Sequence, residues 1–454
     1  MTAINPKIFK AYDIRGVYEV DFDDQLAYKL GLAYCQMRCQ ELNKKQVSVV
    51  VGADMRLSSP VLKESLIKGL VEGGAQVIDI GMSSTPTFYF AVSNYNYDGG
   101  IIVSASHNPR EYNGFKLVRE KAMPIGAGRG MEVLKDLVMS DKLRPADDLG
   151  TLEELEVVLK NVEHDLLFAD VRKIKPFKVA IDPANGMGAQ YLEALFNRLP
   201  CELIKMNWEP DGNFPNHEAD PFKEKNLADL CQKVKDEKCD FGIATDGDGD
   251  RVFFVDDLGR PVEAGITRAM LCKIFLEEEP GAKIAYDIRP GRITKDVILE
   301  NGGEPIVTKV GHSYIKAKAI EEGVYFAGES SGHFFVNTDI GFFETPMIVI
   351  LEIMEELSEK NMTFSDYIRP FQKYHHSGEI NTQVDNPQEK MEEVKQLYAD
   401  GQLNELDGVS IDYDDFWFNV RPSNTEPLLR LNLEATSQEI MERERDKLLE
   451  IIRR

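Results

Sequence analysis

The chain has 454 residues, of which 43% are hydrophobic and 29% are charged, a composition typical of globular proteins. Its formal net charge of −24 argues against binding to nucleic acids or anionic membranes, because both require a basic surface. No apolar run approaches the about 20 residues that span a bilayer, and the first residues lack the apolar core of a signal peptide. We therefore expect a cytoplasmic protein, a monomer or a small homo-oligomer, with no nucleic-acid or membrane partner.

One pattern occurs three times along the chain. A β-branched run ends at an aspartate, and a loop, an amphipathic helix and a second strand follow; the aspartates are Asp54, Asp182 and Asp287. Continuous apolar runs followed by helices are typical of strand–helix units in buried, mostly parallel sheets. We expect an α/β fold of three similar domains, covering residues 1–150, 151–253 and 254–370.

The C-terminal part differs, because its strand-like and helical segments do not repeat this pattern. A charged helix is expected over residues 387–401, strands over residues 412–422 and 428–436, and a closing helix over residues 437–454. This order predicts a fourth, smaller α+β domain over residues 371–454. The acidic stretch of residues 146–156 is expected to be a solvated connection after the first domain.

The segment Asp246-Gly-Asp-Gly-Asp-Arg251 places three carboxylates two residues apart between two strand-like runs. Oxygen ligands of this kind suit Mg²⁺ or Ca²⁺, and the glycines let the backbone bend enough for the carboxylates to converge. An EF-hand loop is excluded, because Arg251 stands where that loop needs glycine and Asp257 where it needs glutamate. A polar turn without a metal is disfavoured, because three crowded negative charges would repel one another.

A second segment, Ser104 to Pro109, reads SASHNP and follows the apolar strand GGIIV. Its residues are turn formers, so a plain turn is one interpretation. A serine beside a histidine at the end of a strand can also be an activated nucleophile, which makes Ser106 and His107 candidates. Lys116 lies downstream and could supply a cation to the same loop.

Two further loops carry polar groups suited to a phosphorylated sugar. Gly328 to His333 reads GESSGH, and its carboxylate and hydroxyls can bond to sugar hydroxyls. Arg421 to Pro427 reads RPSNTEP, and its arginine and turn-prone backbone can bind phosphate. Each loop alone is equally compatible with a plain turn.

Together these segments resemble the α-D-phosphohexomutase family, and most closely its phosphomannomutase/phosphoglucomutase branch. That family has four signatures in a fixed order, one per domain, and all of them are present here: SASHNP, DGDGDR, GESSGH and RPSNTEP. The resemblance covers essentially the whole chain. It implies three α/β domains with mixed four-stranded sheets plus a C-terminal α+β domain around a central cleft.

The resemblance also implies an activity, the interconversion of hexose 1-phosphate and hexose 6-phosphate, with mannose or glucose as the sugar. Ser106 would carry the phosphate, and Asp246, Asp248 and Asp250 would bind Mg²⁺ together with an oxygen of that phosphate. Hexose 1,6-bisphosphate would be the intermediate and activator. The remaining site residues implied by the resemblance act in catalysis (Arg15, Lys116, His312 and His333) or in substrate binding (Tyr12, Arg251, Arg289, Glu329, Ser331, Arg421, Ser423, Asn424 and Thr425). His107, a candidate from its own segment, is a further candidate for the general base.

Two positions depart from the family pattern. Arg289 stands where this branch often has lysine, and an arginine is a poor proton donor that favours planar contacts. Ser330 stands where bispecific relatives often have methionine, which leaves the preferred hexose open.

Three other functions compete with this hypothesis. Phosphoglucosamine mutases usually open with a GTDGIRG-like segment rather than FKAYDIRG, so that activity ranks lower. A phosphatase of the haloacid-dehalogenase type would use Asp246 as its nucleophile, but its motif normally opens the catalytic domain. A non-catalytic sugar-phosphate sensor could dispense with Ser106 and the metal residues, all of which are present.

Overall fold

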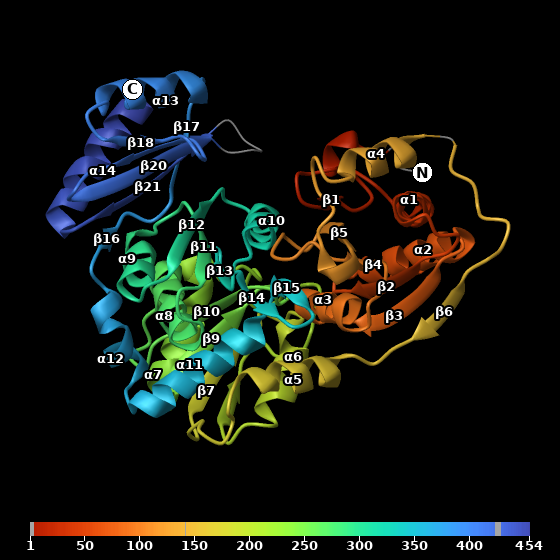
Figure 1. Cartoon of the computed structure of the whole chain (residues 1–454), viewed down its shortest axis with the longest axis horizontal. Helices are drawn as coiled ribbons and strands as arrows, with labels where there is room; N and C mark the ends of the chain where they lie inside the picture. Colours follow the sequence, from red (N-terminus) through yellow and green to blue (C-terminus); the bar gives the residue numbers. More distant parts are fainter. Residues whose placement is uncertain (1–3, 141, 423–427) are drawn as a thin grey trace. The chain divides into compact units, whose positions relative to one another are not determined.

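The computed structural model describes residues 4–140, 142–422 and 428–454, and its chain forms two compact units (Figure 1). Unit 1 comprises Met1–Val262 and Gly332–Ser365, and unit 2 comprises Glu263–Ser331 and Asp366–Arg454. Within the described residues, no helix is both long and apolar enough to cross a membrane.

The first sheet of unit 1 has six strands, in the order β1-β5-β4-β2-β3-β6. Strands β4, β2, β3 and β6 run parallel, whereas β5 and β1 are antiparallel to their neighbours, so the sheet is mixed as predicted. It has six strands rather than the expected four. The strands are β1 (Ile14–Val17), β2 (Ser48–Ala53), β3 (Gln76–Met82), β4 (Gly99–Val103), β5 (Tyr112–Arg119) and β6 (Thr151–Glu154).

Helices cover both faces of this sheet, which explains why its strands are almost continuously apolar. Val49 and Val51 pack against one set of helices with Leu66, whereas Val50 and Ile102 pack on the opposite face with Phe88. The first set is α1 (Asp24–Leu42), α2 (Ser59–Glu72) and α4 (Met131–Met139), and the opposite face has α3 (Thr85–Asn94).

Strand β6 corrects one prediction. The acidic stretch of residues 146–156 was expected to be a solvated connection, but Thr151–Glu154 pairs in parallel with β3 as the edge of the sheet. All four of its side chains are exposed. Backbone pairing with β3 and a hydrogen bond from Nε2 of Gln76 to Oε1 of Glu153, at 3.2 Å, hold the strand, so its sequence lacks the apolar residues by which a strand is predicted.

The rest of unit 1 contains a four-stranded sheet, in the order β10-β9-β7-β8, a β-hairpin and four helices. The sheet strands are β7 (Lys178–Asp182), β8 (Glu202–Lys205), β9 (Phe241–Thr245) and β10 (Val252–Val255); the hairpin strands are β14 (Phe334–Thr338) and β15 (Gly341–Glu344); the helices are α5 (Val158–Asp165), α6 (Gly188–Phe196), α7 (Ala228–Glu237) and α11 (Pro346–Lys360). Strands β9 and β10 are antiparallel, with Thr245 opposite Val252, so the loop that joins them reverses the chain tightly.

Unit 2 contains parallel strands in the order β12-β11-β13. A separate antiparallel sheet follows along the chain, in which β21 pairs with β16, β17 and β20. The parallel part contains α8 (Ala264–Glu278), β11 (Lys283–Asp287), α9 (Arg292–Glu300), β12 (Glu304–Thr308), α10 (His312–Glu322) and β13 (Phe326–Gly328). The antiparallel part contains β16 (His375–His376), β17 (Ile380–Gln383), α13 (Pro387–Leu397), β18 (Gln402–Asn404), β19 (Val409–Asp412), β20 (Phe416–Pro422), β21 (Leu428–Ala435) and α14 (Gln438–Arg453). The predicted charged helix and closing helix are confirmed as α13 and α14.

Candidate active site

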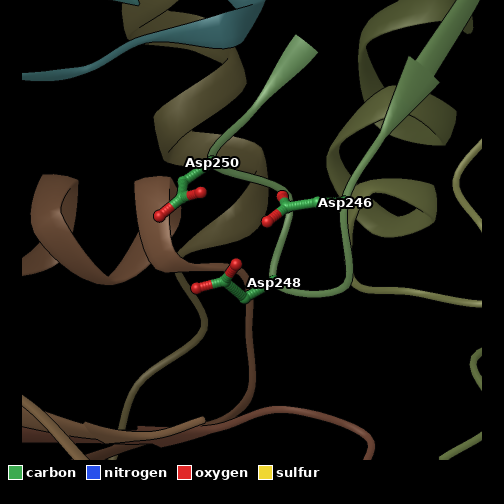
Figure 2. A group of neighbouring side chains, drawn as sticks. All are labelled: Asp246, Asp248 and Asp250. Carbon is green, nitrogen blue, oxygen red and sulfur yellow. The ribbon is translucent and has the colours of Figure 1, made fainter. Parts of the chain in front are cut away.

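Three aspartates on the loop between β9 and β10 form a compact acidic cluster in unit 1. Figure 2 shows the carboxylates of Asp246, Asp248 and Asp250 turned toward a common space. One oxygen from each lies within 4.8 Å of the others, and all three residues are buried. Gly249 permits this turn, because its φ of +72° lies in the left-handed region that favours glycine.

One ammonium group partly balances this buried negative charge. Nζ of Lys116, on β5, lies 2.5 Å from Oδ2 of Asp248 and 2.5 Å from Oδ2 of Asp250. Burial alone would lower the pKa of Lys116, but these two carboxylates raise it well above its usual value. Lys116 is therefore protonated. Burial, together with Asp250 and Asp248, raises the pKa of Asp246.

The donor set fits a divalent metal ion. It consists of carboxylate oxygens, the ligands that hard cations prefer, and net negative charge remains after Lys116 is counted. Oδ1 of Asp248 is buried and has no hydrogen-bond partner among the described residues, although a buried carboxylate oxygen normally has one. The arrangement of the three carboxylates therefore suggests a metal-binding site.

Ser106 lies beside the cluster, on the loop between β4 and β5. Its Oγ donates a hydrogen bond to Oδ2 of Asp246 at 2.7 Å and lies 3.2 Å from Nδ1 of His107. Its φ of +50° is uncommon for a residue other than glycine. The two segments, 140 residues apart in sequence, thus meet in one site.

Cationic and imidazole groups of unit 1 also lie near the serine loop and the acidic cluster. Arg15, on β1, donates from Nη1 to Oδ1 of Asn108 at 2.5 Å. The backbone N–H of Arg251 donates to Oδ1 of Asp246 at 3.2 Å, and Nε2 of His333 lies 3.2 Å from Oδ1 of Asp250. Burial, Arg251 and Arg15 lower the pKa of His107 well below its usual value, so its imidazole is neutral.

Tyr12 lies in the turn that precedes β1. It is partly buried.

In unit 2, Glu329 follows β13 on the predicted sugar-binding loop. The backbone N–H of Gly311 donates to its Oε1 at 2.7 Å, and Oγ of Ser331 donates to its Oε2 at 3.4 Å. His312 begins α10, directly after Gly311. Arg289 binds Oδ2 of Asp287 through Nε at 2.9 Å and through Nη2 at 2.5 Å.

Ser330 points into the same buried ionic network. Its Oγ donates to Oδ1 of Asp287 at 2.9 Å, and Nη1 of the fully buried Arg268 lies 3.2 Å from that Oγ. The hydroxyl of Ser330 is therefore hydrogen-bonded within the protein and anchors the loop.

Arg421, at the end of β20, forms an ion pair with Glu379, its Nη2 lying 2.6 Å from Oε2. Arg430 binds the other oxygen of the same carboxylate at 2.9 Å. Burial opposes ionisation of Glu379, yet Arg421, Arg289 and Arg430 lower its pKa. The other predicted phosphate-binding residues, Ser423, Asn424 and Thr425, lie outside the described residues.

Several residues that contact these loops were not predicted. Thr85 donates from Oγ1 to Oδ2 of Asp248 at 2.5 Å, and Arg56 binds backbone carbonyls of the serine loop. Glu379 and Arg268 were also missed. The sequence offered one local signal for Arg56, since it follows Asp54 by two residues just as Arg289 follows Asp287.

Comparison with known proteins identifies the family to which the chain belongs. The chain matches all four domains described for phosphoglucomutase/phosphomannomutase: α/β/α domain I over residues 6–138, domain II over residues 157–259, domain III over residues 266–374 and the C-terminal domain over residues 379–451. The protein therefore belongs to the phosphoglucomutase/phosphomannomutase family, and the predicted membership is confirmed.

Individual relatives are similar over nearly their whole length. The chain is 38% identical to a phosphomannomutase of Methanocaldococcus jannaschii, covering 98% of this chain and 97% of that one. It is also 38% identical to a phosphomannomutase of Vibrio cholerae, covering 94% of both chains. A crystal structure of a phosphoglucomutase/phosphomannomutase family protein from Burkholderia thailandensis superposes with a TM-score of 0.89 at 32% identity, covering 99% of this chain and 98% of that one.

Proposed function

We propose that the protein is a phosphohexomutase that interconverts hexose 1-phosphate and hexose 6-phosphate through a phosphorylated Ser106. The observation that carries this proposal is the contact of Ser106 Oγ, at 2.7 Å, with a carboxylate of a buried three-aspartate cluster. A hydroxyl beside such a cluster suits phosphoryl transfer, in which catalysis consists mainly of positioning and charge neutralisation.

The reaction we propose has two transfers. In the first, O6 of hexose 1-phosphate attacks the phosphorus on Ser106; the Oγ–P bond breaks, the O6–P bond forms, and the O6 proton passes to a base. The resulting hexose 1,6-bisphosphate turns end for end. In the second, Ser106 Oγ attacks the phosphorus on O1; the Oγ–P bond forms, the O1–P bond breaks, O1 takes the proton back from the base, and hexose 6-phosphate is released.

Asp246, Asp248 and Asp250 would hold Mg²⁺, which supplies charge neutralisation to the transferring phosphoryl group when bound. Lys116 would add a fixed positive charge, because its two carboxylate partners keep it protonated. For the same reason it is a poor base. We assign proton acceptance to a histidine, His107 or His333; His107 is neutral and lies 3.2 Å from Ser106 Oγ.

The other residues have proposed roles in substrate binding. Arg15, Arg251 and Tyr12 would bind the phosphosugar near Ser106. Glu329 and Ser331 would bind the sugar hydroxyls, while His312 and Arg289 would contact the substrate nearby. Arg421, Ser423, Asn424 and Thr425 would bind the phosphate that is not transferred.

The preferred sugar is proposed to be mannose, glucose or both, since the similar proteins from Methanocaldococcus jannaschii and Vibrio cholerae are phosphomannomutases. We propose that the enzyme acts in the cytoplasm, where its charged phosphosugar substrates are retained. We also propose that it is a monomer or a small homo-oligomer.

Initial rates on mannose 1-phosphate, glucose 1-phosphate and glucosamine 1-phosphate test this proposal, with a trace of the matching bisphosphate as activator. We expect conversion to the 6-phosphate on mannose or glucose and loss of activity after chelation of divalent cations. Release of free phosphate without isomerisation would instead indicate a phosphatase. Preference for glucosamine 1-phosphate would contradict the assigned sugar.

A further inference from the structure

A single buried guanidinium, that of Arg56, holds the backbone of the loop that carries Ser106. Nη2 of Arg56 donates to the carbonyl oxygens of Ser106 at 2.7 Å and Asn108 at 2.6 Å. Nη1 donates to the carbonyl oxygens of Pro109 at 2.7 Å and Tyr112 at 3.0 Å. One side chain thus binds four carbonyl groups along seven consecutive residues.

The guanidinium is itself fixed in place. Its Nε lies 3.2 Å from Oδ2 of Asp54, which directly follows β2. Oδ1 of Asp54 accepts hydrogen bonds from the backbone N–H of Arg56 at 3.0 Å and from Oγ of Ser59 at 2.6 Å. The ring of Phe214 lies 5.2 Å from the guanidinium carbon. Arg56 is only 1% exposed.

The chemistry of this contact requires arginine in particular. A guanidinium offers five N–H donors in a rigid planar fork, whereas the ammonium of lysine offers three donors at one point. The four N–H groups on Nη1 and Nη2 of Arg56 bond to the carbonyls of the loop, whereas Nε contacts Asp54 only as an ion pair. A lysine at this position would keep the charge but could not reach all four carbonyls.

The hydrogen bond from Arg56 to the carbonyl oxygen of Ser106 affects the orientation of the Ser106 residue, which carries the hydroxyl. Ser106 has a φ of +50°, and its carbonyl oxygen lies between Nη2 of Arg56 and Gly247. A Cβ at Gly247 would lie only 2.5 Å from that oxygen, so the carbonyl is closely confined. A backbone in an uncommon conformation persists only where its surroundings hold it. Fixing the carbonyl therefore fixes the backbone from which the Ser106 side chain extends, with its Oγ bonded to Asp246.

We propose that Arg56 is a positioning residue for Ser106: by holding the carbonyls of its loop, it orients Oγ for phosphoryl transfer without touching the substrate. This inference rests on the proposed mutase function. It predicts that loss of Arg56 slows the transfer step and leaves substrate binding unchanged, since none of the four carbonyls is proposed to bind the sugar.

The test compares Arg56→Lys with Arg38→Lys. Arg38 is a matched control because it is equally buried, lies in the same sheet-and-helix domain and binds the carbonyl of Asp98, away from Ser106. We expect Arg56→Lys to lower kcat about 100-fold, because a displacement of about 1 Å in a reacting group costs about that much. KM should be unchanged. The rate at which hexose 1,6-bisphosphate phosphorylates Ser106 in a single turnover, followed by intact mass, should fall equally.

The control separates positioning from general stability. Arg38→Lys should lower the melting temperature while leaving kcat and the phosphorylation rate of the folded protein as in the wild type. Equal losses of kcat per folded molecule in both variants would overturn the inference, as would an unchanged kcat in folded Arg56→Lys. A wild-type protein without mutase activity would overturn the proposed function instead.

A second variant covers the case in which Arg56→Lys does not fold. Asp54→Asn keeps an oxygen for Ser59 and for the backbone of Arg56 but removes the charge that holds the guanidinium. We expect a lower kcat with an unchanged KM. A wild-type kcat in this variant would overturn the inference.

Discussion

Replacing Lys116 with methionine would remove an ammonium group from the acidic cluster and keep most of the side-chain volume. Among the described residues, no other lysine ammonium lies within 4 Å of the three carboxylates. At an effective dielectric constant of about 20, each of its 2.5 Å ion pairs is worth about 7 kcal/mol before desolvation is subtracted. Removing one partner of a buried ion pair typically costs about 3–5 kcal/mol net, because an uncompensated charge remains buried. We expect a loss of this size in metal-free protein.

The assay measures the free energy of unfolding of the whole chain by chemical denaturation in the presence of a chelator. Unfolding is monitored by a spectroscopic signal that arises in unit 1. Lys63→Met is the matched control, since the ion pair of Lys63 with Asp79, at 2.8 Å, is partly exposed: 22% and 14% of its side chains are accessible to solvent, against 5% and 0% for Lys116 and Asp248. Solvent screening weakens such a pair, so its loss should cost less; fully exposed pairs contribute up to about 1 kcal/mol. Mg²⁺ should stabilise Lys116→Met more than it stabilises the wild type, because the variant leaves more negative charge for the cation to balance.

The reasoning would be refuted by either of two results. Lys116→Met could lose no more stability than Lys63→Met in the presence of chelator. Alternatively, Mg²⁺ could leave Lys116→Met unaffected while stabilising the wild type.

Three further predictions concern other parts of the chain. Ser106→Ala should nearly abolish mutase turnover in steady-state assays, and full turnover would discard Ser106 as the nucleophile. Arg421→Ala should lower kcat/KM about 10- to 100-fold, because a charge-assisted hydrogen bond is worth about 1.5–3 kcal/mol; wild-type constants would remove Arg421 from the site. Burial raises the pKa of Glu434 from 4.5 to about 7. Between these two pH values the folded state keeps a proton on Glu434 that the unfolded state has released. The free energy of unfolding should therefore fall by up to about 3 kcal/mol as pH rises from about 4.5 to about 7. Glu434→Gln should abolish this slope in thermal unfolding measured across that range, and an unchanged slope would contradict the assignment.

Much of the fold could be predicted because it is encoded locally. The strands that end near Asp54, Asp182 and Asp287 are continuous apolar runs, and the structure forms β2, β7 and β11 there. Strand β6 could not be predicted, because its exposed residues Thr151–Glu154 bury no apolar side chains and are held mainly by pairing with the backbone of β3. The secondary-structure propensities of these four residues do not indicate that they pair with β3.

Some features of the candidate site are likewise encoded locally, whereas others depend on distant segments. The convergence of Asp246, Asp248 and Asp250 follows from their spacing on one turn, so the sequence predicts it. The partners that balance and fix these groups come from distant segments: Thr85 lies 163 residues from Asp248, and Lys116 lies 132 residues from it. The sequence predicted Lys116 as a cation near the serine loop, but its ion pairs with Asp248 and Asp250 and the contact of Thr85 form only in the folded chain and required the structure.

The central claim is that the hydroxyl of Ser106 carries phosphate in the catalytic cycle. The most direct test is to incubate the protein with hexose 1,6-bisphosphate and Mg²⁺, quench it, and map the covalent phosphate by peptide mass spectrometry. We predict one phosphate, on Ser106, that survives hydroxylamine and disappears when hexose 1-phosphate is added. A phosphate on Asp246 that hydroxylamine cleaves, or a fully active protein that is never phosphorylated at Ser106, would contradict the claim.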